Sequence, residues 1–447
     1  MENSFKNKAL EYHSTDRAGK TATMPTKPVE SPEQLTLAYT PGVAAPAMEI
    51  SKERWRAYRY TNKGNLVAVV SNGSSLLGLG NKGALASKPV MEGKAMLFKT
   101  YADIDAFDIE ISDEEPEKIV ATIQSLAPTF GGINIEDIKA PECFYIEKRL
   151  RELLDIPVLH DDQHGTAVTV AAALLNACKV TGKSFNEIKI VINGAGAAAI
   201  ASANMLLEMG IEPNRITMLD SKGVINTRRT DINEMKRRFA TDSKATTLSQ
   251  AIDGSDVFIG LSKGGLLSDN DVKSMAESPI IFALANPEPE ISYSRAKQLR
   301  TDAVVATGRS DSPNQINNVL SFPYLFRGAL DTLSTTINEA MKIAAARAIA
   351  GIAQEEITKE ITEQYGRKFT FGHEYILPKP SDRRLLTKVS AAVAQAAMTS
   401  GVARRGIASF SEYSQTLLRR VDNSNFFARE YIRHKIRHYE TERDWEI

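Results

Sequence analysis

Four carboxylates in two adjacent pairs are the residues of this sequence best suited to chemistry. Glu136 and Asp137 follow one apolar run, and Asp161 and Asp162 follow another. Four acids held together repel one another without a cation, and oxygen ligands are those that Mg²⁺ and Mn²⁺ prefer. We therefore predict a divalent metal site, although each pair taken alone also reads as a turn or a helix N-cap.

Two further side chains could transfer protons. Tyr39 stands between an apolar run and a Pro41-Gly42 turn, where its phenol can face a cleft; a half-buried packing role is the simpler interpretation. Lys94 is expected in the first turn of a helix that starts near Met91, where the helix dipole and burial disfavour an ammonium ion. Such a lysine can serve as a base, whereas most lysines are solvated at the surface.

The elements that must position these groups alternate between strands and helices. Apolar runs predict strands at 65–70, 105–111, 132–138, 153–160, 188–193, 215–220, 256–261, 280–285 and 303–307, and helical patterns predict helices at 117–126, 166–180, 200–209, 329–364 and 385–404. This alternation predicts an α/β fold with parallel sheets, in which side chains at the carboxyl ends of strands meet ligands. The two acidic pairs follow two such strands.

Two glycine patterns compete as a dinucleotide site. The first, at Gly78, Gly80 and Gly83, follows a predicted strand, but we expect Pro89 to break the helix that a phosphate cradle needs. We interpret it as a tight loop near the substrate. The second pattern, residues 194–199, has a strand before it and an unbroken helix after it, which predicts a Rossmann unit.

The predicted cofactor contacts come from this second unit. Asp220 ends the next strand, 24 positions after Gly196 (220 − 196), where an acid takes the ribose hydroxyls of NAD. Ser221, Lys222 and the basic run 236–238 could instead meet the 2′-phosphate of NADP, so both cofactors stay open, although a solvated helix face explains the run more simply. The expected contacts are Thr166, Gly194, Gly196, Ala198, Ala199, Asp220, Ser221 and Lys222.

Asparagines follow two of the later strands. Asn286 comes after the strand at 280–285, and Asn317 and Asn318 come after the strand at 303–307. An amide both donates and accepts hydrogen bonds without charge, so it can orient a carboxylate or a nicotinamide carboxamide. Alternatively, these asparagines only form turns and contact no ligand.

Composition and charge narrow the partners and the compartment. The 447 residues carry 55 Lys+Arg and 55 Asp+Glu, so nothing calls for nucleic acid or an anionic membrane. Cys143 and Cys178 have no metal-ligand spacing, and no apolar run has membrane-spanning or signal-peptide length. We expect a cytoplasmic protein. The charged tail 410–447 either docks as a last helix or begins a linker.

Several motifs in fixed order together resemble the malic enzymes, in particular the bacterial short-subunit type found as the front part of hybrids with a phosphotransacetylase-like domain. They are LAYTPGVA (37–44), LLGLGNKG (76–83), MEGKAMLFK (91–99), NIEDIKAPECF (134–144), HDDQHGTA (160–167), VINGAGAAAIA (191–201), MLDSKGVI (218–225), FALANPEPEI (282–291) and PNQINNVLSFPYLFRGALD (313–331). The resemblance implies a substrate and metal domain at 1–163, similar to that of amino-acid dehydrogenases. It also implies a Rossmann NAD(P)-binding domain at 164–400 and a helical tail at 401–447.

The resemblance also implies a role for each matching residue. These are a general acid at Tyr39, a general base at Lys94, an acid that assists the lysine at Asp161, metal ligands at Glu136, Asp137 and Asp162, and substrate or nicotinamide contacts at Asn286, Asn317 and Asn318, with Tyr39 and Lys94 also touching substrate. Ser75 departs from the long-subunit pattern, which has an arginine there for a malate carboxylate. Lys99 or a cation of a partner subunit would have to replace that arginine.

The implied activity is oxidative decarboxylation of L-malate to pyruvate and CO₂, with NAD or NADP and with Mg²⁺ or Mn²⁺. We expect a homodimer or a larger homo-oligomer, and cleft closure by a hinge near Gly165. The alternatives are a malolactic reaction, an amino-acid dehydrogenase that needs no metal, and a non-catalytic ligand-sensing module of a hybrid protein. Retention of Tyr39, Lys94 and the acids argues against the last.

Overall fold

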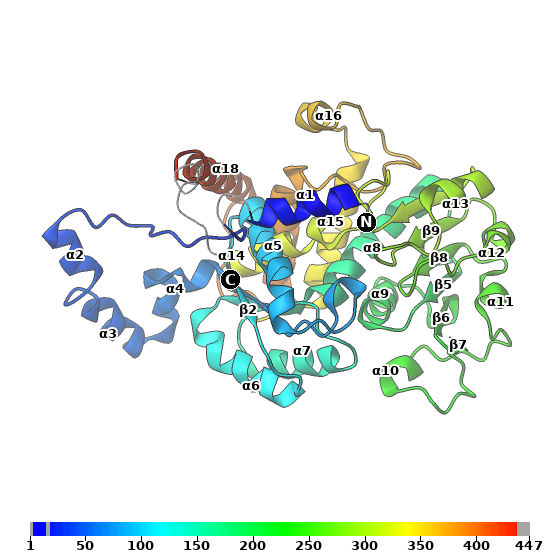
Figure 1. Ribbon diagram of the computed structural model, residues 1–447, viewed down its shortest axis with the longest axis horizontal. Coiled ribbons are helices and arrows are strands. Elements are labelled where there is room, and N and C mark those ends of the chain that lie inside the picture. Colours follow the sequence, from blue (N-terminus) through cyan, green and yellow to red (C-terminus); the bar gives the residue numbers. More distant parts are fainter. Residues whose placement is uncertain (1–2, 15–17, 436–447) are drawn as a thin grey trace.

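The computed structural model describes residues 3–14 and 18–435 and contains two largely parallel sheets, each covered by helices (Figure 1). The first sheet has the order β2-β1-β3-β4, with β1 Leu66–Ser71, β2 Asp105–Glu110, β3 Gly132–Ile135 and β4 Val158–His160. The second has the order β10-β9-β8-β5-β6-β7, with β5 Ile190–Asn193, β6 Ile216–Asp220, β7 Gly223–Val224, β8 Val257–Gly260, β9 Ile280–Ala283 and β10 Val304–Thr307. Only the short β7 is antiparallel to its neighbour among these strands. The predicted α/β class is confirmed.

Strand β1 is apolar without interruption because both of its faces are covered. Leu66, Ala68 and Val70 pack into one core, and Val67 and Val69 pack into the other. The first core includes side chains of α6 (Pro116–Leu126) and α7 (Glu142–Leu153), and the second includes side chains of α5 (Ala84–Ala102). Such a doubly covered strand is typical of parallel sheets.

The second sheet is built by the same alternation. Ile190 and Ile192 of β5 face a core that includes the long helix α8 (Asp161–Thr181) and α9 (Ala197–Glu208), whereas Val191 faces the opposite side. That opposite side carries α11 Leu248–Ile252, α12 Asp269–Ser274 and α13 Tyr293–Leu299, and α10 Glu234–Arg237 lies on the connection after β7.

The C-terminal helices return to the first sheet. Phe322 and Phe326 of α14 (Phe322–Asp331) meet Phe98 of α5 edge to face, with ring centroids 4.8 and 5.3 Å apart. The other C-terminal helices are α15 Glu339–Gln354, α16 Lys359–Tyr365, α17 Ser390–Thr399 and α18 Phe410–Lys435. On α18, Arg420 donates to Asp103 at 3.2 Å, so the described part of the charged tail docks as a last helix, while 436–447 lies outside the described residues.

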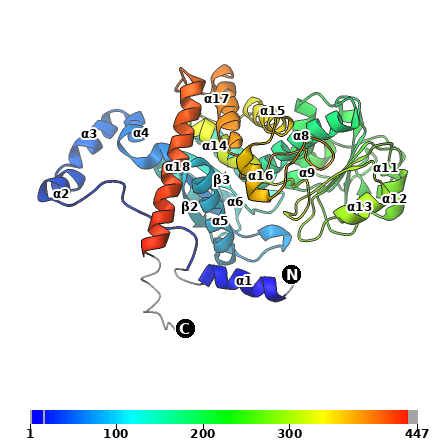
Figure 2. The ribbon, with the colours of Figure 1, turned by 90° about the horizontal axis from the view of Figure 1, so that it is seen from above.

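The N-terminal arm, residues 21–60, projects from this body in both views (Figures 1 and 2). It follows α1 (Asn3–Ser14) and carries α2 Pro32–Ala38, α3 Ala44–Lys52 and α4 Ala57–Tyr60. None of these last three helices buries a residue. The arm therefore exposes apolar side chains to solvent, and the most exposed are Leu37, Tyr39, Met48 and Trp55.

Two predicted helix starts near the acidic pairs were wrong, and the helix predicted at 329–364 is divided among the end of α14, α15 and α16. Pro89 does not break a helix: it lies inside α5, which begins directly after Gly83, so Lys94 sits in the third turn and not the first. A proline inside a helix costs about 3 kcal/mol, because it lacks an N–H and its ring clashes with the preceding turn, and burial of one side of α5, including Met91 and Phe98, offsets that cost.

Helix α8 begins at Asp161 and not at Thr166, so both aspartates occupy its first turn, where the helix dipole favours negative charge. Gly165, near which we expect a hinge for cleft closure, lies inside this helix, which is continuous through that residue. Among the described residues, no helix is both long and apolar enough to cross a membrane.

Candidate active site

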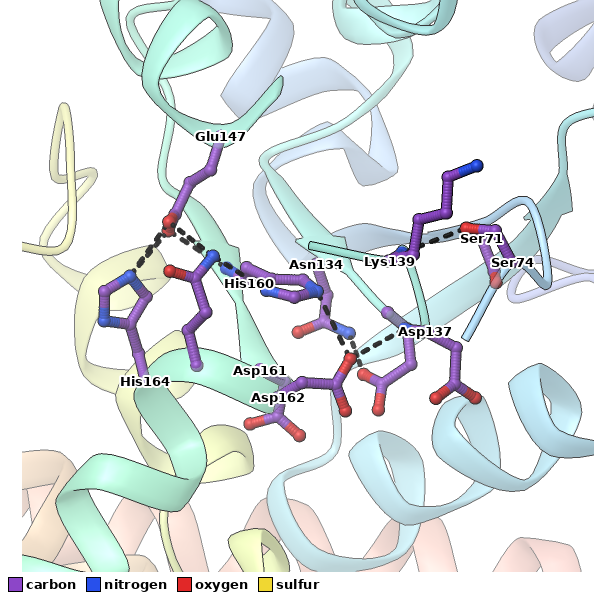
Figure 3. Close-up of polar contacts among 12 residues, drawn as sticks. Ser71, Ser74, Asn134, Asp137, Lys139, Glu147, His160, Asp161, Asp162 and His164 are labelled. Carbon is purple, nitrogen blue, oxygen red and sulfur yellow. Dashed lines mark hydrogen bonds and ion pairs between the residues drawn. The ribbon is translucent and has the colours of Figure 1, made fainter. Parts of the chain in front are cut away.

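The two acidic pairs meet at the carboxyl ends of neighbouring strands, as predicted. Strands β3 and β4 pair in parallel, with Ile135 opposite His160, so the residues that follow them lie at one edge of the sheet. The main-chain N–H of Asp137 donates to Oδ2 of Asp162 at 2.7 Å (Figure 3). The pairs therefore form one cluster, in which Glu136, Asp137 and Asp161 are buried.

Lys94 points into this cluster from α5. Its Nζ lies 2.6 Å from Oδ2 of Asp161 and 3.0 Å from Oε1 of Glu136. The same ammonium lies 4.2 Å from the ring centroid of Phe322, so one side of it meets an aromatic face. The lysine, expected to be either a base or a surface residue, is buried among the predicted ligands.

The charge state of Lys94 differs from the sequence expectation. Burial alone would lower the pKa of Lys94, but the negative charges of Asp161 and Glu136 outweigh burial and raise it. Without a cation at the acids, Lys94 is an ammonium ion. The expectation of a lowered pKa was wrong for this state, because it counted the helix dipole and burial and omitted two carboxylates in contact.

Burial and neighbouring charges also shift the pKa values of the acids. Burial, together with the charge of Asp162, raises the pKa of Asp137 to about 7. Burial also raises the pKa of Glu136 well above its usual range, although Lys94 opposes this rise. Burial would likewise raise the pKa of Asp162, but a hydrogen bond from His160 lowers it. The cluster thus holds more carboxylates than its one lysine neutralises.

Four residues beyond the predicted site residues support the cluster. Asn134 donates to Oε2 of Glu136 at 2.9 Å, and Nε2 of His160 lies 3.2 Å from Oδ2 of Asp162. Glu147 of α7 accepts from the main-chain N–H of His160 and from Nε2 of His164 (Figure 3). His160 and His164 stand within the conspicuous HDDQHG run, but Glu147 lies on an ordinary amphipathic helix and gives no local signal.

The donor set has the chemistry of a hard divalent cation site. Oδ2 of Asp137, Oδ1 of Asp161 and Oδ1 of Asn134 are buried oxygen atoms with no hydrogen-bond donor among the described residues. Such oxygens, and an excess of carboxylates, fit a cation such as Mg²⁺. Within residues 3–14 and 18–435, however, no three acidic, histidine or cysteine side chains already converge as a ligand set. Glu136, a predicted ligand, contacts Lys94 instead, so a cation would have to draw Glu136 away from the lysine.

The cation that would replace the missing arginine is not Lys99. Nζ of Lys99 binds Asp103 at 2.7 Å and Asp105 at 2.8 Å, and Asp105 opens β2 at the amino end of the sheet, away from the cluster. Ser75 itself does lie at the site, because its N–H donates to the main-chain oxygen of Asp137 at 3.0 Å.

The glycine turn at 194–199 has the form of a phosphate cradle. Gly194 has φ 138°, and a Cβ there would lie 2.5 Å from the main-chain oxygen of Leu261. A Cβ on Gly196 would meet nothing within 4 Å, so this face is open. Gly196 caps α9 without a side-chain hydrogen bond, which leaves the first N–H groups of α9, at Ala198 and Ala199, free for a pyrophosphate.

Asp220 lies beside this turn but is not free. The N–H of Gly194 donates to the main-chain oxygen of Leu219, directly before Asp220. The carboxylate of Asp220 is bound by Arg229 and Lys236. Burial would raise the pKa of Asp220, but these two side chains lower it to about 2.

The asparagines approach the cluster from the second sheet. A Cβ on Gly165 would lie 2.9 Å from Cβ of Asn318 and 1.9 Å from Oδ1 of Asp161, so Asn318 borders the first turn of α8. The hydroxyl of Thr169 lies 3.4 Å from the main-chain oxygen of Asn317. Thr166 lies on the same helix, between Gly165 and Thr169.

Asn286 adjoins the first glycine loop. A Cβ on Gly78 would lie 3.1 Å from its main-chain oxygen. The loop that we expected near the substrate therefore contacts a predicted substrate residue from the other sheet.

Tyr39 is the one predicted catalytic residue that the structure does not bring to the cluster. It lies in the projecting N-terminal arm and is 69% exposed. Its side chain is neither half-buried nor in a cleft of its own chain. The alternative prediction, that Tyr39 packs half-buried against its own chain, is therefore wrong as well.

Comparisons with known proteins agree with this geometry. The family model described as malic enzyme, N-terminal domain, matches residues 18–114 and 110–151. The model described as malic enzyme, NAD binding domain, matches residues 163–364. A crystal structure of malic enzyme from Pyrococcus horikoshii Ot3 superposes with a TM-score of 0.87 at 42% identity, covering 98% of this chain and 99% of that chain.

Two curated relatives come from Rhizobium meliloti (strain 1021). This chain is 54% identical over 416 residues to its NADP-dependent malic enzyme, covering 93% of this chain and 55% of the relative. It is 52% identical over 420 residues to its NAD-dependent malic enzyme, covering 94% of this chain and 54% of the relative. The chain therefore spans about half the length of these relatives, and they differ in the cofactor that they are named for.

Proposed function

This chain belongs to the malic enzyme family, and from that membership we propose that it converts L-malate to pyruvate and CO₂ with reduction of NAD(P)⁺ and dependence on a divalent metal. The observation that carries the proposal is the contact of Lys94 with Asp161 and Glu136 at the carboxyl end of the first sheet. It joins a proton carrier to an oxygen-rich cluster. The open glycine turn belongs to the adjoining sheet, as hydride transfer to a dinucleotide requires.

The metal would be held by Glu136, Asp137 and Asp162. When bound, Mg²⁺ or Mn²⁺ would supply a Lewis acid for the C2 hydroxyl and for the enolate that decarboxylation leaves. With Glu136 engaged as a ligand, Lys94 keeps Asp161 as its only carboxylate partner. Its ammonium form is then stabilised by one acid fewer, which lowers its pKa toward the range of a working base.

Lys94 takes the proton of the C2 hydroxyl while the C2 hydride passes to the cofactor. Asp161 holds the lysine through the 2.6 Å hydrogen bond and keeps it aimed at the substrate. The resulting oxaloacetate loses its C4 carboxylate as CO₂. Tyr39 then protonates C3 to give pyruvate, and Lys94 returns its proton to Tyr39. Asn286, Asn317 and Asn318 orient the substrate carboxylate and the nicotinamide amide.

The role of Tyr39 requires a second copy of the chain. The N-terminal arm exposes Tyr39 together with Leu37, Met48 and Trp55, a patch typical of a surface that another molecule covers. An exchanged arm in a two-fold dimer would bury this patch and deliver the phenol to the Lys94 of the partner. We therefore propose a homodimer whose active sites are each completed by the other protomer.

The domain limits stay part of the proposal. A boundary at 163/164 separates the first sheet from the cofactor sheet and falls within the first turn of α8. Helix α14 packs on α5, so part of the proposed cofactor domain, 164–400, completes the core beneath the first sheet. The tail domain begins at 401 and includes α18. Cys143 and Cys178 are free thiols, which fits the reducing cytoplasm that we propose as the location.

One assay tests the function. NADH or NADPH formation from L-malate is followed with Mn²⁺, with and without a chelator, and the products are identified. We expect pyruvate and CO₂, reduced nucleotide, and loss of activity with the chelator. Lactate would instead show a malolactic reaction, insensitivity to the chelator would favour an amino-acid dehydrogenase, and no turnover in the full chain would favour a ligand-sensing module.

A further inference from the structure

The acid at the end of β6 has no free hydrogen-bonding capacity. Oδ1 of Asp220 accepts from Nη1 of Arg229 at 2.8 Å and from the main-chain N–H of Lys222 at 3.0 Å. Oδ2 accepts from Nη2 of Arg229 at 3.0 Å and from Nζ of Lys236 at 2.9 Å. A carboxylate offers about four acceptor positions, and all four are filled. Asp220 therefore cannot take the two ribose hydroxyls of NAD as it stands.

Arg229 is equally saturated. Its Nε and Nη2 donate to Asp231 at 3.0 and 3.1 Å, its Nη1 and Nη2 donate to Asp220, and Nη1 also faces the main-chain oxygen of Gly223 at 3.5 Å. A guanidinium has five N–H groups, and all five are used. Arg229 thus holds the two acids in place and offers no donor to a ligand.

The two lysines of the cluster keep unused donors. Nζ of Lys222 binds Asp231 at 2.7 Å and Nζ of Lys236 binds Asp220 at 2.9 Å. An ammonium has three N–H groups, so each lysine has capacity for a further acceptor. The Lys222 side chain is 67% exposed, and Ser221 beside it is exposed too. Three cations against two acids leave this end of β6 positive by one charge (3 − 2).

We propose that Lys222 and Lys236 bind the 2′-phosphate of NADP, that Ser221 adds a hydroxyl donor, and that Arg229 is a positioning residue that withholds Asp220 from the ribose of NAD. The inference rests on the proposed function, because it names the cofactor that the glycine turn receives. It also corrects two expectations. Asp220 does not present itself to ribose hydroxyls, and Lys236 is not merely part of a solvated helix face.

Binding of two adenine nucleotides to the full chain tests this without turnover. Adenosine 2′,5′-bisphosphate carries the 2′-phosphate, and 5′-AMP lacks it. By calorimetry, wild type should prefer the bisphosphate, and Lys222→Gln and Lys236→Gln should each weaken the bisphosphate by about ten- to a hundredfold while leaving AMP unchanged. The control is Arg228→Gln, because Arg228 is exposed and its side chain donates only to the main-chain oxygen of Ser243 among the described contacts.

The positioning role of Arg229 has its own readout. Arg229→Gln should weaken the bisphosphate and strengthen AMP, because the freed Asp220 can then accept ribose hydroxyls. The double variant Asp220→Asn/Arg229→Gln should lose the gain in AMP affinity, which a merely structural defect would not do. Equal affinities of wild type for the two nucleotides, or no binding of either, would overturn the inference.

The two proposals fail separately. Malate-dependent reduction of NAD and NADP at equal kcat/KM would leave the enzyme function standing and overturn the inference. Selective binding of the bisphosphate by a chain that does not oxidise malate would overturn the function and leave the phosphate site.

Discussion

The main-chain N–H of Asp137 donates a 2.7 Å hydrogen bond to Oδ2 of Asp162, which ties the end of β3 to the first turn of α8. One oxygen of Asp162 is thereby fixed in position, while Oδ2 of Asp137 stays buried without a donor among the described residues. This hydrogen bond therefore holds two of the three proposed ligand residues next to each other before any cation binds.

Metal binding should stabilise the folded chain. A cation that binds the native acids at a hundred times its Kd adds about 2.7 kcal/mol to the free energy of unfolding. We expect Mn²⁺ to raise Tm for wild type and not for Asp162→Asn. Asp155→Asn, which changes an exposed carboxylate, should keep the full shift. Equal shifts in wild type and Asp162→Asn would contradict the ligand assignment.

Replacement of Lys94 should remove proton transfer and spare cofactor binding. Lys94→Ala is expected to lower kcat by about 10² to 10⁴, the usual contribution of a general base. Nucleotide affinity should not change, because Lys94 lies on α5, which packs on the first sheet and not on the cofactor sheet. Lys88→Ala on the same helix is the matched control, since Lys88 pairs with Asp108 away from the acids. A Lys94→Ala chain with wild-type kcat would remove Lys94 from the mechanism.

Tyr39 and Lys94 should complement each other between protomers. Tyr39→Phe and Lys94→Ala chains are each expected to be nearly inactive, but a refolded equal mixture should regain activity. About half of randomly assorted two-fold dimers are mixed, and each has one intact site of two, so about a quarter of wild-type activity should return. A mixture no more active than its parents would show that Tyr39 serves its own chain or has no role.

Glu147 should stabilise the fold at neutral pH and not in acid. Burial would raise the pKa of Glu147, but its contacts with His164 lower it to about 2. Burial lowers the pKa of His164, and Lys342 donates to its Nδ1 at 3.0 Å, so the neutral ring donates from Nε2 to Glu147.

Because the folded pKa of Glu147 is depressed, its contribution is present above the unfolded value of about 4.3 and is lost as pH falls toward about 2. Glu147→Gln should therefore cost about 1 to 3 kcal/mol at pH 7 in urea unfolding. The difference from wild type should shrink below pH 4. A difference that is constant with pH would assign the loss to packing.

Gly165 allows close packing between the first turn of α8 and its neighbours. A Cβ there would lie 1.9 Å from Oδ1 of Asp161, so Gly165→Ala must displace the acid that holds Lys94. We expect kcat to fall at least about tenfold with little change in nucleotide affinity. Gly351→Ala in α15 is the control, because its Cβ would meet nothing within 4 Å, and alanine there should stabilise by up to about 1 kcal/mol. Wild-type kcat in Gly165→Ala would show that the contact is unimportant.

Much of this site follows from local sequence patterns. Glu136 and Asp162 follow apolar runs that are strands, and parallel strands end at one edge, so their meeting could be predicted. What local pattern does not contain is the partner of each group. The sequence alone predicts a lowered pKa for Lys94, because it does not show that Asp161 lies beside the ammonium. It predicts that Asp220 binds ribose hydroxyls, because it does not show that Arg229, nine residues later, occupies the carboxylate. The predicted helix break at Pro89 failed for the same reason, because burial of α5 outweighs the local cost of a proline inside the helix.

Helix α8 links the two sheets mechanically. It carries Asp161 and Asp162 at one end, and its length of about 30 Å is packed against the helices of the cofactor sheet. If α8 moves as a rigid body, a tilt of about 5° about its C-terminal end shifts Asp161 and Asp162 at its N-terminal end by about 2 to 3 Å. Because the helix is continuous, a reorientation of the nucleotide-holding half would move Asp162, and the positions of the metal ligands would then depend on the position of the second sheet.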